Sequence, residues 1–132
     1  MEKRILVIDD DESFLRMIAR VLQLEGYRVD TAKTGKEAIE KSNANSYNLA
    51  IIDLRLPDMD GTDLLTALRD PTPRTIKIML TGHVSAGDKT EAIKKNADGY
   101  LVKPIATVEL LKTIKDHLEK QSAAIQGPSC AA

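Results

Sequence analysis

Two segments of the chain carry carboxylates where a buried strand is expected to end. Asp9 and Asp10 directly follow the apolar run Ile5–Ile8. Asp53 directly follows a second apolar run, Leu49–Ile52. Carboxylates brought close together raise one another's pKa and destabilise the fold unless a cation shares the site. Oxygen ligands without thiolates or clustered histidines favour Mg²⁺, with Mn²⁺ as an alternative, so these acids predict a metal site.

Two further strand ends carry groups suited to binding phosphate. Thr81 follows the apolar run Ile76–Leu80, and Lys103 follows the run Tyr100–Val102. Each residue alone has an ordinary explanation, because acids often cap helices and polar residues are common in loops. A hydroxyl and an ammonium beside three acids, however, form the set that phosphoryl chemistry with Mg²⁺ requires. The joint placement therefore favours a metal-dependent phosphate site.

The elements between these residues predict how they are positioned. Short continuous apolar runs are typical of strands buried on both faces, and a fifth, half-polar run spans 28–32. Segments with helical periodicity separate the runs. One helix is expected to end at Gly26, and the next to begin with Thr34 and Glu37 in capping-box spacing. Three more helices are expected at about 62–69, from Ser85, and at about 107–120.

Strands that alternate with helices imply a parallel sheet with helices on both faces. We expect an α/β, flavodoxin-like (βα)5 fold, doubly wound, with strand order 2-1-3-4-5. In such sheets ligands bind beyond the carboxyl ends of the strands, where the strand order reverses. That order makes strands one and three neighbours and brings Asp9 and Asp10 alongside Asp53.

Composition limits the other possibilities. A chain of 132 residues with 42% hydrophobic residues predicts one domain, at 1–121, followed by a flexible tail or the start of a linker at 122–132. The formal net charge of -1 and the lack of a basic run argue against nucleic-acid binding. Neither a signal peptide nor a membrane span is apparent, so we expect a cytoplasmic protein. Cys130 has no partner cysteine for a disulfide or a thiolate metal site.

The segments VIDDDES, IIDLRLPDMDG, MLTGH and GYLVKPI together resemble the receiver domains of two-component response regulators. The similarity covers about Lys3 to Gln121. It implies that Asp53 is the phosphoacceptor and takes a phosphoryl group from a sensor histidine kinase or a phosphotransfer protein. It also implies that the Asp10 and Asp53 carboxylates bind Mg²⁺ directly together with the Arg55 backbone carbonyl, and that Asp9 binds it through water.

The resemblance assigns further roles. Thr81 and Lys103 would hold the phosphoryl oxygens, Tyr100 would be the switch aromatic, and the Lys103–Pro104 bond would be cis. The surface of the fourth helix, fifth strand and fifth helix would bind a downstream target or output domain. Such a protein is a regulatory phosphoacceptor with self-phosphotransfer and autodephosphorylation, and not an enzyme in the usual sense. We expect a monomer that can dimerise on phosphorylation, without membrane or direct nucleic-acid contacts.

Three alternative functions remain open on the residues alone. A flavin or nucleotide binder would need a Gly- or Thr-rich loop after the first strand, where this chain has acids. An aspartyl-nucleophile phosphatase usually has a second acid two residues after the nucleophile, where this chain has Arg55. A receiver that docks independently of phosphorylation is the third. The chain could be a stand-alone receiver or one segment of a larger regulator or hybrid kinase.

Overall fold

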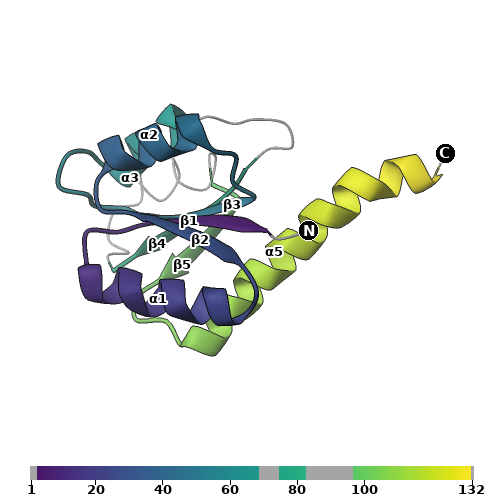
Figure 1. Cartoon of the computed structure of the whole chain (residues 1–132), viewed down its shortest axis with the longest axis horizontal. Coiled ribbons are helices and arrows are strands. Elements are labelled where there is room, and N and C mark those ends of the chain that lie inside the picture. Colours follow the sequence, from purple (N-terminus) through teal and green to yellow (C-terminus); the bar gives the residue numbers. More distant parts are fainter. Residues whose placement is uncertain (1–2, 69–74, 83–96, 132) are drawn as a thin grey trace.

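The computed structural model of the chain describes residues 3–68, 75–82 and 97–131, with the backbone alone at residues 62, 81 and 121–131. The described elements are β1 (Arg4–Ile8), α1 (Glu12–Leu24), β2 (Arg28–Ala32), α2 (Gly35–Ala44), β3 (Leu49–Asp53), α3 (Gly61–Ala67), β4 (Ile76–Thr81), β5 (Gly99–Val102) and α5 (Thr107–Ala131). Figure 1 shows the sheet between two helical layers, with α2 and α3 on one face and α1 and α5 on the other.

The sheet has five parallel strands in the order β2-β1-β3-β4-β5, which confirms the predicted fold. β1 lies second from the edge and pairs with both β2 and β3. The register pairs Ile8 of β1 with Ile52 of β3, so the residues that follow these two strands leave the sheet at the same edge. The topology therefore brings Asp9, Asp10 and Asp53 together.

Alternate strand residues fill two separate cores, as expected for a sheet covered on both sides. Leu6 and Ile8 of β1 face α2 and α3, whereas Ile5 and Val7 face α1 and α5. The same alternation continues in β3, where all residues up to Ile52 are buried. This burial on both faces holds the strands rigidly and fixes the positions of the loops at their carboxyl ends.

Local signals in the sequence account for the end of α1. Gly26 follows the C-cap with a φ of 95°, a left-handed conformation that glycine adopts without steric penalty. The Gly26 N–H donates to the Gln23 carbonyl (3.0 Å), and the Tyr27 N–H donates to the Leu22 carbonyl (3.1 Å). These bonds form a Schellman motif, which confirms Gly26 as the predicted end of the helix.

The predicted capping box at the start of α2 is also present. The Thr34 side chain accepts a hydrogen bond from the Glu37 N–H (3.0 Å). The Glu37 carboxylate in turn accepts from the Lys33 N–H (2.8 Å), one residue before the N-cap. The first bond satisfies an N–H group of the first turn of α2, and the second makes this a variant of the capping box, because its donor is the residue before the N-cap and not Thr34 itself.

Helix α5 differs from the sequence expectation. It continues to Ala131, whereas the apolar stripe predicts an end near Lys120. Its last turns extend away from the sheet (yellow in Figure 1). An apolar stripe is needed only where a helix packs on the sheet, and the alanines after Ser122 favour helix without one. The division into a domain at 1–121 and a tail stays a prediction, and the helix expected from Ser85 lies outside the described residues.

None of the helices in the described ranges combines the length and the apolar character needed to cross a membrane.

Candidate functional site

The four acids after β1 have four different environments. Asp11 is the N-cap of α1, and its carboxylate accepts from the N–H groups of Ser13 (3.0 Å) and Phe14 (3.2 Å). Glu12 forms an ion pair with the Lys33 ammonium. Two of the acids therefore have ordinary structural roles. The other two, at positions 9 and 10, turn toward the carboxyl end of β3.

Asp9, Asp10 and Asp53 form the predicted carboxylate cluster. One oxygen from each side chain lies within 4.8 Å of the other two. Asp9 is almost completely buried at 1% exposure, Asp53 is half-buried and Asp10 is exposed. The cluster is therefore buried on the Asp9 side and exposed to solvent at Asp10.

Lys103 supplies the positive charge at this cluster. Its ammonium donates to the Asp9 carboxylate at 2.6 Å, and it also lies over the Phe14 ring, 4.9 Å from the centroid. The other Asp9 oxygen accepts from the Asp11 N–H (3.0 Å). Burial lowers the pKa of Lys103, but the hydrogen bond and charge of Asp9 more than offset this, so its pKa lies above the ordinary value. Lys103 is therefore a cation that neutralises Asp9.

Among the described residues, Asp53 has no comparable partner. The Arg55 N–H donates to its carboxylate at a long 3.5 Å. Burial and the charge of Asp9 raise the pKa of Asp53 to about 6, against opposing contributions from Lys103 and the Arg55 N–H. The carboxyl group is thus ionised at neutral pH but is destabilised in that form. A carboxyl group with a raised pKa, next to two other acids, is typical of functional sites.

The β3–α3 connection forms a tight hairpin that begins at Asp53. The Gly61 N–H donates to the Leu54 carbonyl (2.6 Å), and residues Arg55 and Asp60 form an antiparallel bridge. A Cβ at Gly61 would clash with the Asp53 carbonyl oxygen and lie 2.9 Å from the Leu54 Cα. Glycine is therefore required for the backbone to return so closely to the end of β3.

The other predicted residues are only partly placed. β4 ends at Thr81, one residue after Leu80, which pairs with Asp53 in the sheet. The Thr81 side chain is outside the described part of the structure, so its contact with phosphate stays a prediction. Tyr100 is half-buried and packs against the core on the α2 and α3 side. The peptide bond between Lys103 and Pro104 is cis, as the resemblance implies.

Sequence reasoning missed two residues at this edge of the sheet. The first is Phe14 of α1, whose ring contacts the Lys103 ammonium. Asp58, at the tip of the β3–α3 hairpin, accepts hydrogen bonds from the Gly35 N–H (2.8 Å) and the Lys36 N–H (2.9 Å) of α2. The free N–H groups at a helix start often bind a nearby acid, but nothing in the sequence of the turn indicates that Asp58 contacts the start of α2.

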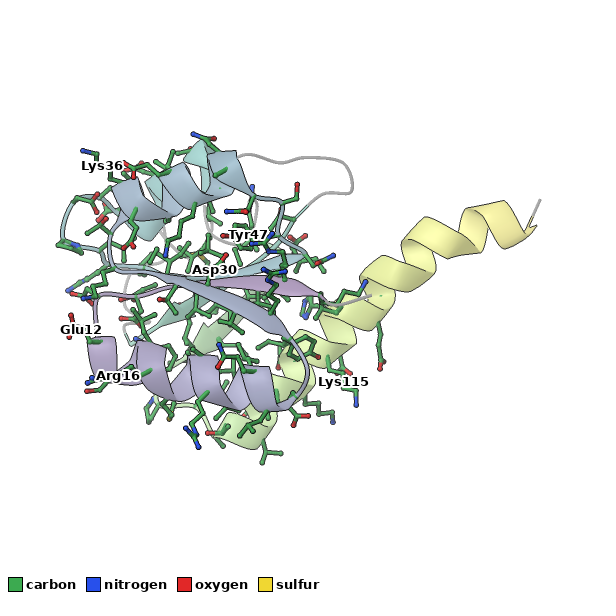
Figure 2. The ribbon with its side chains drawn as sticks, viewed as in Figure 1. Glu12, Arg16, Asp30, Lys36, Tyr47 and Lys115 are labelled. Carbon is green, nitrogen blue, oxygen red and sulfur yellow. The ribbon has the colours of Figure 1, made fainter. Side chains whose placement is uncertain are left out.

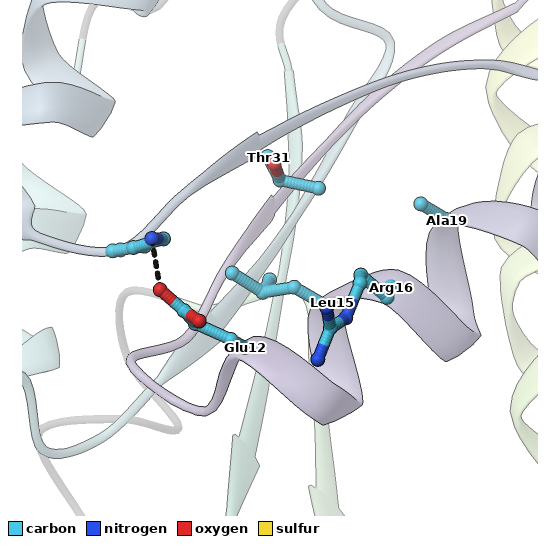
Figure 3. A pocket seen from close by; sticks show the side chains of 6 residues that line it. Glu12, Leu15, Arg16, Ala19 and Thr31 are labelled. Atoms are coloured by element: carbon cyan, nitrogen blue, oxygen red, sulfur yellow. Dashed lines mark hydrogen bonds and ion pairs between the residues drawn. The ribbon is translucent and has the colours of Figure 1, made fainter.

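A second cleft, of about 320 Å³, lies between α1 and the edge strand β2 (Figure 3). Its lining residues are Glu12, Leu15, Arg16, Ala19, Thr31 and Lys33. Figure 3 shows the ion pair between Glu12 and the lysine of the β2–α2 loop at one end of the cleft. Both side chains are more than half exposed, so the pair is worth little energetically. The clustered carboxylates do not line this cleft.

Comparisons with known proteins agree with this geometry. The family model of the response regulator receiver domain matches residues 5–115. Transcriptional regulatory protein PrrA of Mycobacterium tuberculosis is 32% identical over 126 residues, which cover 96% of this chain and 54% of that protein. A CheY-like receiver domain protein from Methanospirillum hungatei is 38% identical with a TM-score of 0.87, covering 94% of this chain and 99% of that one.

A response regulator from Burkholderia pseudomallei, crystallised with a phosphorylated aspartic acid, a calcium ion and citrate, is 32% identical with a TM-score of 0.76; the match covers 97% of this chain and 73% of that one.

The fold and the acidic pocket define a regulatory domain of the phosphoacceptor class, and this chain belongs to the response regulator receiver domain family. Domains of this family act as phosphorylation switches in two-component signalling. The chain spans about half the length of the curated relative, at 54%. The activity and partners of a longer protein are therefore matters for proposal.

Proposed function

We propose that this chain is a Mg²⁺-dependent signalling switch that accepts a phosphoryl group on Asp53 from a sensor histidine kinase or a phosphotransfer protein. The observation that carries this proposal is the carboxylate cluster, in which Asp53 is ionised at neutral pH but forms no ion pair with any of the described residues. The Burkholderia response regulator, with its phosphorylated aspartic acid and calcium ion, supports the same chemistry by similarity.

The donor set fits a hard divalent cation. Lys103 neutralises Asp9, so Asp10 and Asp53 leave two negative charges in the pocket. Carboxylate oxygens are the ligands that Mg²⁺ prefers, and it usually keeps several waters. We assign direct binding to the Asp10 and Asp53 carboxylates and the Arg55 carbonyl, and binding through water to Asp9. When bound, the ion would offset the negative charge that gathers on the phosphoryl oxygens during transfer.

The residues of the chain would carry out the transfer itself. An oxygen of the ionised Asp53 carboxylate attacks phosphorus, while the P–N bond of the donor phosphohistidine breaks and its electron pair returns to the imidazole. Lys103, held by Asp9 at 2.6 Å, stabilises the anionic oxygens, and the Thr81 hydroxyl donates to one of them. Attack of water on the phosphorus of the aspartyl phosphate, with cleavage of the P–O bond to Asp53, would release inorganic phosphate and give autodephosphorylation.

A groove of about 510 Å³ beside Lys103 supports access by a protein donor. Phe14, Met17 and Ile105 form its apolar walls, and Met17 remains 46% exposed. A phosphohistidine must reach Asp53, which is half-buried at the carboxyl edge of the sheet, so a donor protein needs surface to contact beside it. We assign this groove to the approach of the donor.

The output would be a change of protein surface. In the proposed switch, Thr81 moves toward the phosphoryl group and Tyr100 fills the space that it leaves, which changes the surface of the fourth helix, β5 and α5. The target would be an output domain in a longer protein or a separate protein. Because PrrA is a transcriptional regulatory protein, the expectation of no nucleic-acid contact stays a prediction for this chain alone.

Intact-mass measurement after incubation with Mg²⁺ and acetyl phosphate tests the proposal, with Asp53→Asn as the control. We expect one added phosphoryl group on the wild-type chain, and none on the variant or in a chelator. An unmodified wild-type protein under all these conditions would instead favour the docking receiver that works without phosphorylation.

A further inference from the structure

The tip of the β3–α3 hairpin is attached to the start of α2 by two independent contacts. The Asp58 carboxylate spans the Gly35 and Lys36 N–H groups, with one oxygen 2.8 Å from the first nitrogen and the other 2.9 Å from the second. The Met59 side chain occupies the space where a Cβ at Gly35 would lie. The carboxylate contact is thus supported by close packing, and Gly35 leaves the room for it.

The two bonds are favourable for a physical reason. The N–H groups at a helix start have no partner within the helix, and the helix dipole places partial positive charge there. Both hydrogen bonds lower the pKa of Asp58 below its ordinary value, which keeps it ionised at neutral pH. Thr34 already satisfies the Glu37 N–H, so Asp58 binds two different N–H groups of the same helix start.

A short ladder connects this tip to the candidate metal site. The Leu56 N–H donates to the Met59 carbonyl (3.2 Å), Arg55 forms a bridge with Asp60, and the Gly61 N–H donates to the Leu54 carbonyl (2.6 Å). Each step along the ladder is one residue closer to Asp53. A displacement of the tip would therefore move the Arg55 backbone, which also donates toward the Asp53 carboxylate.

We propose that Asp58 is a positioning residue of the phosphoacceptor site, which fixes the Arg55 backbone and Asp53 by clamping the hairpin tip to the start of α2. This inference rests on the proposed Mg²⁺ site. The inference also implies that the first turn of α2 is coupled to metal binding at the base of the β3–α3 hairpin, opposite the tip that Asp58 holds. By reciprocity, a metal that stabilises the hairpin base must strengthen the clamp by the same factor.

The ordinary alternative is that Asp58 stabilises α2 as a second cap and does nothing else. The chain offers a matched control for this alternative, because Thr34→Ala weakens the start of the same helix without touching the hairpin. A second control, Glu12→Gln, removes a negative charge at the same rim whose partner is Lys33 and not the hairpin. Together the two variants separate helix stability and net charge from positioning.

The experiment measures Mg²⁺ binding to the full chain by calorimetry, for the wild type, Asp58→Ala, Asp58→Asn, Thr34→Ala and Glu12→Gln. We expect Asp58→Ala to weaken Mg²⁺ binding roughly tenfold, as is usual when a group that supports metal ligands is lost. Asp58→Asn should restore part of the affinity, since an amide oxygen also caps helices well. Both controls should retain the wild-type dissociation constant.

Hydrogen exchange on the wild-type protein gives a test that needs no variant. Mg²⁺ should slow exchange of the Gly35 and Lys36 amides and leave the amides at the end of α2 unchanged. Equal Mg²⁺ affinity of Asp58→Ala and Thr34→Ala, with exchange unaffected by Mg²⁺, would overturn the inference and leave Asp58 as a helix cap. A wild-type chain that does not bind Mg²⁺ would overturn the proposed function itself, and the inference with it.

Discussion

Removing the charge of Asp53 should stabilise the metal-free protein. The pKa of Asp53 lies at about 6 instead of the ordinary 3.8, chiefly because of burial and the charge of Asp9. At about 1.4 kcal/mol for each pKa unit, this corresponds to about 3 kcal/mol for a fully buried group. Asp53 is only half-buried, and solvent screening reduces the effect to about 1.5 kcal/mol. For a domain of this size, that raises the Tm of Asp53→Asn by about 5 °C.

The sign of the pH dependence follows from the direction of the shift. Because the folded-state pKa of Asp53 is raised, its ionised form favours the unfolded state. The advantage of Asp53→Asn over the wild type should therefore be absent below pH 3.8, increase as pH rises through 6, and remain constant above that. Asp116→Asn, at an exposed position of α5, is the matched control and should show no such profile.

Urea denaturation in a chelator, repeated at several pH values, measures this difference directly. Excess Mg²⁺ should then reverse the order of stability, because a ligand that binds the folded state stabilises it and the variant lacks one of its carboxylates. A variant that is equally or less stable than the wild type at pH 7.5 without metal would refute the argument. In that case the three carboxylates would not repel one another, and the reason for placing a cation among them would disappear.

Three more substitutions test contacts in the same structure. Lys103→Met should lower stability by about 2 kcal/mol in urea denaturation, because it leaves the buried Asp9 carboxylate without its cation. Gly61→Ala should lower the Tm and weaken Mg²⁺ binding, since its Cβ would push against the Asp53 carbonyl; an unchanged Tm would contradict the close approach. Tyr47→Phe should destabilise the fold by about 1.5 kcal/mol through loss of a 2.6 Å hydrogen bond to the carboxylate on β2, without changing Mg²⁺ affinity.

The features that the sequence predicts well are those with a local or periodic cause. Continuous apolar runs locate the strands, because only doubly covered strands lack polar alternation. Gly26 and the Thr34 capping box end and begin helices through contacts within a few residues. The acid cluster is predictable because parallel strands with that order must end at one edge. The cluster can therefore be predicted from the strand order alone, without knowing which distant residues contact one another.

The contacts that the sequence does not predict join segments that are far apart in the chain and that no topological rule brings together. The Asp58 clamp connects positions 23 residues apart through main-chain N–H groups, which have no signature in the sequence. Lys77, the second residue of β4, is buried at 8% exposure, and its ammonium donates to the Leu65 carbonyl near the end of α3 (3.0 Å). A lysine in a buried strand requires such an acceptor, but the pattern alone does not identify it.

Two aspartates of the same sheet show why the candidate site can be recognised by its charges. Asp30, on β2, accepts from the Tyr47 hydroxyl (2.6 Å) and pairs with the Arg4 guanidinium (3.3 Å). Figure 2 shows Asp30 and Tyr47 together on the α2 side of the sheet. There the acid has partners, and the large perturbation falls on the tyrosine, whose burial and bond to Asp30 raise its pKa.

At the carboxyl edge the balance is different. Within the described residues, the three carboxylates lie near one ammonium, that of Lys103, and the raised pKa is that of Asp53, whose hydrogen bond from the Arg55 N–H is long. A fold that pairs an acid with a cation at one edge could do so at the other, so the excess of negative charge is a property of the site and not of the sheet. In the proposed switch a divalent ion would supply the positive charge, and the exposed side of the cluster would leave space for the phosphoryl group that Asp53 would accept.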